Sequence, residues 1–179
     1  MQVNTTSLSG VLVLTPQVFS DARGCFYESF NQAALEVATG LKTRFVQDNH
    51  STSTRGVLRG LHFQLAPKAQ GKLIRIVQGE VFDVVVDIRR DSPTYGKWHG
   101  EVLSAEDRKQ IWVPPGLAHG FLVLSESAEF LYKTTDYYAP ELERCLRWDD
   151  PTVGVAWPLA GRQPLLSEKD RQGLPLAAL

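Results

Sequence analysis

KLIRIVQGEVFDVVVDI, residues 72–88, contains two strand-like runs separated by a glycine. Residues 72–78 form the first run, Gly79 marks a turn and residues 81–88 form the second run, so the segment predicts a β-hairpin. The two-residue period of a strand places the odd-numbered residues of the second run, including Asp83, on one face. Its even-numbered residues, which are all apolar, share the other face.

Further short strands with turn signals between them follow this segment. They are expected at KWHGEVL (97–103), QIWVPPG (110–116), HGFLVL (119–124), EFLYKTT (129–135) and ERCLRW (143–148). Strands that recur about every 8–12 residues indicate a β-sandwich or barrel. The apolar run VLVL (11–14) predicts one more strand, which either pairs within its own sheet or crosses to a second subunit.

Helices are expected to be few and short. Asn31 is a suitable N-cap for a helix over residues 32–39 that stops at Gly40. The preceding residues 19–30 predict a turn at 21–24, followed by a strand that carries Phe26, Glu28 and Phe30 on one face. The tail from Pro151 is expected to wrap the surface and to contain a short helix in LLSEKDRQG (165–173), capped by Ser167.

Composition limits the classes of protein that are possible. The chain has 179 residues and a net charge of −1, which fits one domain over residues 1–179 and argues against non-specific nucleic-acid binding. Cys25 and Cys145 have no metal or redox spacing, which favours a reduced, cytoplasmic protein. The sequence has no signal pattern and no apolar run of about 18 residues, so neither secretion nor membrane insertion is expected.

The polar stretch QDNHSTSTRGVLRGLHFQ, residues 47–64, is predicted to form one wall of an active site. A plain core does not need a cation, an imidazole and several amides packed so closely. An unperturbed imidazole titrates near neutrality, so a histidine can take a proton from carbon, and His62 is the candidate for this role. It can equally be a buried, hydrogen-bonded structural residue, and the strand alone does not separate the two.

Six segments together resemble the dTDP-4-dehydrorhamnose 3,5-epimerase family. They are FSDARGCFYESF (19–30), residues 47–64, residues 70–98, IWVPPGLAHGFLVLSE (111–126), residues 129–151 and PLLSEKD (164–170). The resemblance implies a mainly β, cupin-like jelly roll with a few short helices. It also implies a homodimer that needs no metal or other cofactor. The implied reaction inverts C3 and C5 of dTDP-4-dehydro-6-deoxy-D-glucose, in dTDP-L-rhamnose biosynthesis for cell-surface polysaccharide such as lipopolysaccharide.

The resemblance implies the catalytic roles. His62 is the base, Tyr132 is the proton donor on the other face of the sugar, and Lys72 faces the keto oxygen, where a fixed cation stabilises an enolate. Asp170 is paired with His62, whose tautomer it fixes. Ser167 and Asp170 alone fit a helix-capping pattern, and we expect one carboxylate not to fill both roles easily.

His119 occupies the histidine position of a cupin motif, Pro-x-Gly-x-x-His, where histidine commonly binds a metal. The first cupin motif normally offers His-x-His plus a glutamate, but here Gln64 stands where the second histidine would be. Two histidines without a clear third ligand make a poor metal site, so no metal is expected. We interpret His119 as a polar contact to the substrate, oriented by Asp83.

Substrate-binding residues follow from charge and from the resemblance. Arg23 and Arg59 suit a diphosphate, because guanidinium groups match phosphate oxygens. Arg59 would face away from His62 in a regular strand, and a bulge at Gly60 would bring both to one side. Gln47 and Asn49 offer amides to a sugar or base. The resemblance implies that Tyr138 stacks on thymine and that Glu28, Glu143 and Lys169 bind the ligand.

Three alternatives stay open on the sequence. A 3-epimerase acting on a related dTDP-keto sugar would carry the same base and acid. A non-catalytic cupin that binds sugar nucleotides is opposed by the intact catalytic set. A metal-dependent cupin oxygenase or isomerase is opposed by Gln64.

Overall fold

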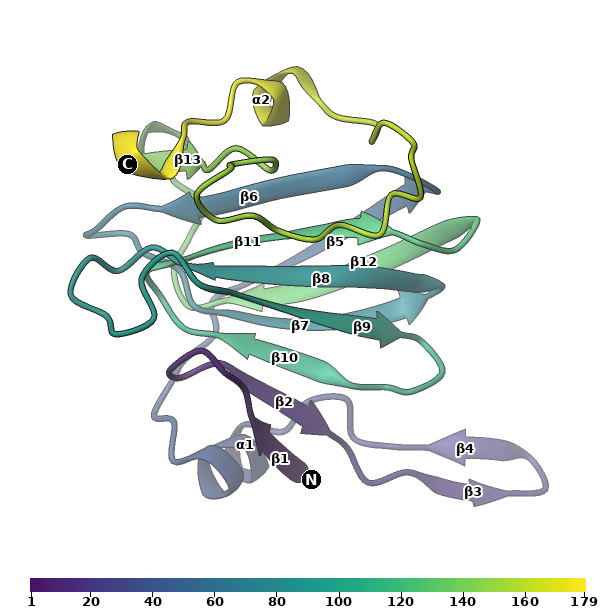
Figure 1. The fold of residues 1–179 in the computed structure, drawn as a ribbon. Coiled ribbons are helices and arrows are strands. Elements are labelled where there is room, and N and C mark those ends of the chain that lie inside the picture. The colour runs from purple at the N-terminus through teal and green to yellow at the C-terminus, as the bar shows by residue number, and fades with distance from the viewer.

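The computed structural model describes residues 1–179, and two antiparallel sheets dominate it (Figure 1). One sheet has the strand order β1 (Gln2–Thr5), β2 (Leu12–Thr15), β10 (Gln110–Val113), β7 (Lys72–Gln78), β12 (Ser127–Thr134), β5 (Gln47–Thr54). The other has the order β13 (Glu143–Cys145), β6 (Leu58–Gln64), β11 (Leu117–Val123), β8 (Glu80–Asp87), β9 (Trp98–Ser104). The predicted mainly β sandwich is confirmed.

The predicted hairpin at residues 72–88 is wrong, although both of its strands are present. β7 pairs with β10 and β12, whereas β8 pairs with β11 and β9 in the opposite sheet. The chain therefore changes sheets at Gly79. This residue has a φ of +77°, and a Cβ there would lie 2.1 Å from the carbonyl oxygen of Ser127, so only glycine fits.

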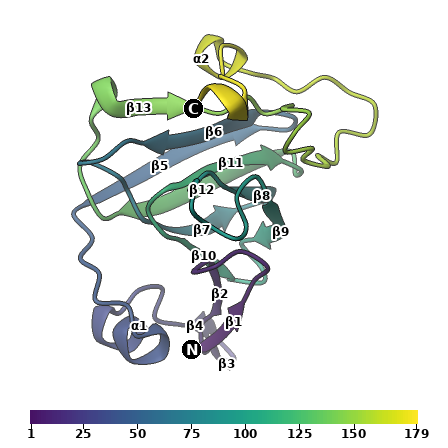
Figure 2. The same cartoon turned by 60° about the vertical axis from the view of Figure 1, so that its left-hand side comes forward.

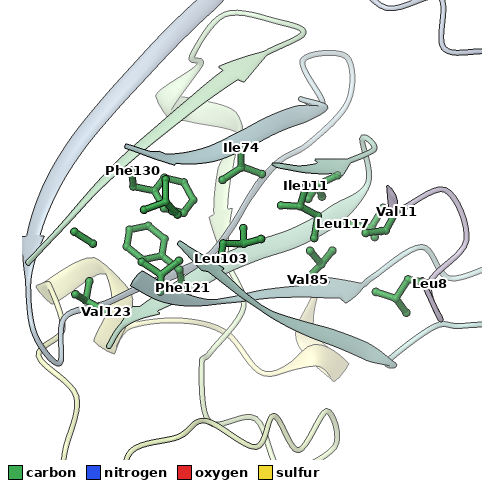
Figure 3. Close-up of a cluster of buried hydrophobic side chains, with 14 residues drawn as sticks. Leu8, Val11, Ile74, Val85, Leu103, Ile111, Leu117, Phe121, Val123 and Phe130 are labelled. Atoms are coloured by element: carbon green, nitrogen blue, oxygen red, sulfur yellow. The ribbon is translucent and has the colours of Figure 1, made fainter. Parts of the chain in front are cut away.

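The main core lies between the sheets, where aromatic and aliphatic side chains from both meet (Figure 3). Phe121 of β11 stacks on Phe130 of β12 with ring centroids 4.0 Å apart. Val81 and Val85 belong to this core, while Phe82, Val84 and Val86 pack on a second cluster with the C-terminal segment. The predicted division of this strand into two faces is confirmed. Each sheet thus has a buried inner face, and the second sheet is also covered from outside.

Both predicted helices are confirmed. Asn31 caps α1 (Gln32–Thr39), which ends at the left-handed Gly40, and Ser167 caps α2 (Glu168–Arg171). Figure 2 shows α1 beside the N-terminal strands and α2 at the opposite end of the molecule, next to β6. Short 3-10 turns occupy Pro140–Leu142 and Leu176–Ala178. None of the helices is long and apolar enough to cross a membrane.

One expectation about the N-terminal region is confirmed and one needs correction. The run VLVL contributes to β2, which pairs within its own sheet between β1 and β10, the first of the two alternatives left open for it. The strand expected over residues 24–30 ends early, because β4 (Gly24–Phe26) pairs only with β3 (Phe19–Asp21) and has no partner beyond Phe26. This hairpin extends away from the sandwich (Figure 1).

Candidate active site

A cavity of about 430 Å³ takes residues from both sheets. β5, β7 and β12 contribute from the six-stranded sheet, and β6, β11 and β13 contribute from the five-stranded sheet. It collects most of the predicted site residues: Gln47, Asn49, Arg59, His62, Lys72, His119, Tyr132, Tyr138, Glu143 and Lys169. Residues spread over more than 120 positions of sequence thus face one space.

His62 lies on β6 with its side chain 26% exposed, and Asp170 of α2 is buried directly against it. Nε2 of His62 is 2.5 Å from Oδ1 of Asp170. Burial opposes ionisation of Asp170, but the hydrogen bonds from His62, Ser167 and the Gly60 amide outweigh burial and hold the pKa of the carboxyl below its usual value. The carboxylate therefore orients the ring and leaves Nδ1 as the ring nitrogen that can take a proton.

Asp170 also belongs to the cap of α2, so the two roles expected to compete are both filled. The hydroxyl oxygen of Ser167 accepts from the backbone N–H of Asp170 at 3.2 Å and its hydrogen is donated to Oδ2 at 2.8 Å. Capping uses the backbone amide of Asp170, whereas the pair with His62 uses the side chain. The two roles therefore fall to different groups of Asp170, and the carboxylate does not have to fill both.

Lys72 begins β7 and is buried, with Nζ donating to the carbonyl oxygen of His62 at 3.1 Å. Burial lowers the pKa of Lys72 to about 8, although the charges of Asp83 and Glu143 act in the opposite direction. A cation in such a place has few competing partners. It can therefore stabilise negative charge that develops on a ligand in the cavity.

Tyr132 lies on β12, on the other sheet from His62, and its ring packs edge-on against Phe130. Burial and the nearby charge of Glu143 raise the pKa of its hydroxyl. The phenol thus stays protonated at neutral pH and can donate a proton into the cavity.

His119 forms a second, more deeply buried pair. Its Nε2 is 2.9 Å from Oδ2 of Asp83, which supports the predicted orientation by that residue. Burial lowers the pKa of His119 despite the carboxylate, so the ring is neutral at physiological pH. Oδ1 of Asp83 is buried without a partner. With Nε2 donating to Asp83, His119 can therefore accept a hydrogen bond at Nδ1 without bringing a charge.

The predicted bulge at Gly60 is confirmed, and it turns Arg59 into the cavity. His62 pairs with His119 and Arg59 pairs with Phe121, so β6 has one residue more than β11 across this interval. Gly60 has a φ of +114°, and a Cβ there would lie 2.7 Å from the Cα of Gly120. The bulge therefore requires glycine. Nε of Arg59 then donates to the hydroxyl of Ser53 at 3.0 Å.

Glu143 joins two other predicted ligand residues at one side of the cavity. It lies 2.5 Å from Nζ of Lys169 and accepts from the hydroxyl of Tyr138 at 2.8 Å. Burial opposes its ionisation, but these two partners lower the pKa of the carboxyl. On β5 of the other sheet, the amide nitrogen of Gln47 donates to Asn49 and its amide oxygen accepts from the backbone N–H of Tyr138. This linked polar group can hold a polar ligand in the cavity by hydrogen bonds.

Arg23 and Glu28 lie outside this cavity. Arg23 is at the tip of the β3–β4 hairpin, 89% exposed and paired with Asp21, and Glu28 accepts from Asn31 beside α1. Neither residue lines the cavity, so one chain alone does not bring these side chains to the other site residues.

Sequence reasoning missed several residues of the site. Ser51 lines the cavity and Ser53 holds Arg59; the two-residue period from Gln47 and Asn49 would have placed both on the same face. Gln70 also lines the cavity, and the only signal was its position in the QGK run before Lys72. Cys145, register partner of His62 on β13, gave no signal.

The geometry does not favour a metal. The side-chain amide of Gln64 is hydrogen-bonded to backbone groups. Its nitrogen donates to the carbonyls of Lys68 and Tyr137, and its oxygen accepts from the N–H of Ala139. The ligand atoms of His62, Cys145 and Asp170 lie within 4.8 Å of one another. However, Nε2 and Oδ1 at 2.5 Å are too close to share a zinc ion with bonds of about 2.0 Å and tetrahedral angles, which needs roughly 3.3 Å.

Fold and site together define a cupin-like β-sandwich enzyme with acid–base groups in its cavity. The sequence model of the family described as dTDP-4-dehydrorhamnose 3,5-epimerase matches residues 5–178. The chain belongs to this family, and the predicted resemblance is confirmed.

Individual relatives agree with this assignment. The chain is 59% identical over 177 residues to the dTDP-4-dehydrorhamnose 3,5-epimerase of Pseudomonas aeruginosa, covering 99% of this chain and 97% of that one. It is similar to the solved 3,5-epimerase of Legionella pneumophila in complex with dTDP-4-keto-L-rhamnose, with a TM-score of 0.95, 48% identity, and 99% and 94% coverage. It is less similar to a 3′-monoepimerase of Streptomyces bikiniensis in complex with dTDP-quinovose, with a TM-score of 0.90, 36% identity, and 96% and 86% coverage.

Proposed function

We propose that this chain is a dTDP-4-dehydrorhamnose 3,5-epimerase of dTDP-L-rhamnose biosynthesis. It converts dTDP-4-dehydro-6-deoxy-D-glucose into dTDP-4-dehydro-L-rhamnose by inverting C3 and C5. Both carbons neighbour the C4 carbonyl, so removal of a proton from either gives an enolate on the same oxygen. One cavity can therefore carry out both inversions.

The observation that carries the proposal is the placement of base and acid on opposite sheets. His62 enters the cavity from β6 and Tyr132 enters it from β12. Inversion needs a proton removed from one face of the sugar and returned on the other. A sugar held between the two sheets would present one face to each residue.

The base side uses three residues. Nδ1 of His62 takes the proton from carbon, and Asp170, at 2.5 Å from Nε2, stabilises the imidazolium that forms. Lys72, buried next to the His62 carbonyl, stabilises the charge on the C4 oxygen. Tyr132 then donates its proton to the opposite face of the carbon.

The remaining cavity residues bind the nucleotide and the sugar. Arg59 and Lys169 are the cations available for the diphosphate, with Arg59 held by Ser53. Tyr138 is 53% exposed and is free to stack on thymine. The complex of the Legionella relative with dTDP-4-keto-L-rhamnose supports a ligand of this kind.

The working enzyme is proposed to be a homodimer, as the resemblance implies. The β3–β4 hairpin carries Phe19 and Phe26, which are 55% and 67% exposed, and an apolar pair of this kind normally contacts something. In a dimer the hairpin would bury both rings against the partner. It would also allow Arg23 and Glu28 to reach a ligand bound there, which they cannot do in their own chain.

The decisive experiment is NMR of the purified protein with dTDP-4-dehydro-6-deoxy-D-glucose in D₂O. Deuterium at both C3 and C5, with inversion at both, is the expected result. Deuterium and inversion at C3 alone would identify a 3-epimerase, which the lower identity to the monoepimerase disfavours. Binding without exchange would identify a non-catalytic sugar-nucleotide protein, against which the assembled His62, Lys72, Tyr132 and Asp170 argue.

A further inference from the structure

We propose that Ser167 is a positioning residue for the His62–Asp170 pair. Its hydroxyl fixes the plane of the Asp170 carboxylate so that Oδ1 faces the imidazole. The link to epimerisation rests on the function proposed above. The effect on the pair itself does not, and it can be measured without substrate.

The hydroxyl of Ser167 does more than an N-cap requires. A cap needs only an oxygen that accepts from the helix, and Ser167 accepts from the N–H of Asp170 at 3.2 Å. Its hydrogen is directed elsewhere, to Oδ2 of the same residue at 2.8 Å. An asparagine or aspartate would cap as well, but a serine also supplies this short donor beside the carboxylate.

The two oxygens of Asp170 have very different surroundings. Oδ1 lies near Nε2 of His62, the N–H of Gly60 at 3.3 Å and, at 4.0 Å, the thiol of Cys145. Oδ2 has one partner, the Ser167 hydroxyl. Asp170 is 3% exposed, so loss of that hydroxyl would leave a buried carboxylate oxygen without a hydrogen bond.

A second fixed point matters because the terminal torsion of an aspartate is soft. Contacts at Oδ1 alone allow the carboxylate to rotate about the bond that carries it. The bond from Oδ2 to Ser167 prevents this rotation, and the segment carrying Ser167 is itself anchored. Leu165, two residues earlier, exchanges backbone hydrogen bonds with Gly56 and Leu58 at the start of β6.

Removal of the donor also changes the proton affinity of the pair in a defined direction. The charged and titratable groups around it are Lys169 on α2, Cys145 and Glu143 on β13, Lys72 on β7 and His119 on β11. None of these replaces the hydrogen bond to Oδ2. Without this hydrogen bond the Asp170 carboxylate is more basic. The His62–Asp170 pair then keeps its proton up to a higher pH, and His62 can act as a base only above that pH.

The test compares Ser167→Gly with Ser167→Thr. Glycine removes the hydroxyl at a small capping cost, and threonine keeps it. We expect Ser167→Gly to lower kcat about tenfold with KM nearly unchanged, and to move the acidic limb of the pH profile to higher pH. Ser167→Thr should restore both. Glu168→Ala, which alters an exposed position of α2, is the control for helix stability and should leave kinetics unchanged.

The His62 ring, followed by NMR titration of the free protein, gives a readout independent of turnover. An upward shift of its pKa in Ser167→Gly that threonine reverses supports the proposal even if the wild type proves not to be an epimerase. The proposal would be overturned if Ser167→Gly showed wild-type kinetics and a wild-type His62 titration and only a lower melting temperature. Ser167 would then serve only as the N-cap of α2. If the glycine variant does not fold, Ser167→Cys, a weaker donor of similar shape, is judged by the same readouts.

Discussion

Oδ1 of Asp170 lies 2.5 Å from Nε2 of His62, although 108 residues separate them in the sequence. His119 and Asp83 form a comparable pair at 2.9 Å. The two pairs differ in burial: the His62 side chain is 26% exposed and the His119 side chain is 7% exposed. A base must reach the substrate and tolerate a positive charge. The pair nearer to solvent is therefore the better base, and the buried pair is the better neutral contact.

Asp170→Asn tests the pairing of Asp170 with His62. The amide cannot stabilise an imidazolium and can bind the wrong tautomer, so we expect kcat to fall by about 10²–10⁴-fold. The cap of α2 uses the backbone amide of residue 170 and should survive. The measurements are kcat and melting temperature, with His62→Asn as the matched loss of the base. Full turnover with early melting would show that the carboxylate serves only α2.

Tyr132→Phe removes the proposed proton donor and keeps the ring that packs on Phe130. His62 can still remove the proton and Lys72 can still hold the enolate. Inversion should slow by about 10²–10⁴-fold, while substrate binding changes little. The measurement is product stereochemistry and deuterium content in D₂O. Inversion of C5 at nearly the wild-type rate would show that water or another residue is the acid.

The alkaline limb of kcat/KM should report Lys72. Burial lowers its pKa to about 8, so the cation is present below this pH and is lost as the pH rises through it. Since kcat/KM follows groups of the free enzyme, it should fall above about pH 8. Lys72→Met should be nearly inactive at all pH values. A wild-type profile that stays flat well above that pH would assign the charge stabilisation to another group.

Turnover should survive exhaustive treatment with a chelator. Gln64, which stands where a cupin metal ligand would be expected, has its amide bonded to three backbone groups. The experiment is activity after chelation and dialysis, with elemental analysis of the same sample. Activity that disappears and returns with one particular divalent ion would contradict the prediction.

Light scattering at micromolar concentration should give the mass of a dimer. The exposed Phe19 and Phe26 of the β3–β4 hairpin are the proposed contact. Phe26→Ser should weaken the dimer and lower activity together, because Arg23 and Glu28 would then no longer reach the ligand bound to the partner. Val37→Ser, at a still more exposed apolar position on α1, is the control. A monomeric mass for the fully active wild type would exclude this arrangement.

Local sequence was sufficient for the individual elements. Alternation along residues 81–88, the Asn31 and Ser167 caps and the Gly40 stop depend on side chains only a few positions apart, and all were predicted correctly. The bulge at Gly60 was also predictable, because Arg59 and His62 are three residues apart and were expected on one side. The resemblance to a family added the roles of residues that no local pattern distinguishes.

Only the tertiary structure decided which strands pair and which side chains meet. A glycine turn between two strands is compatible with a hairpin or with a change of sheet, and the pairing of β7 and β8 with different partners selects the second at Gly79. The sequence gives no sign that Cys145 lies beside His62, because that contact depends on the register of β13 against β6. The same holds for Asp170, whose backbone amide bonds to the cap of α2 while its carboxylate bonds to His62. Such contacts join distant residues through packing, and packing is a property of the whole chain rather than of any segment.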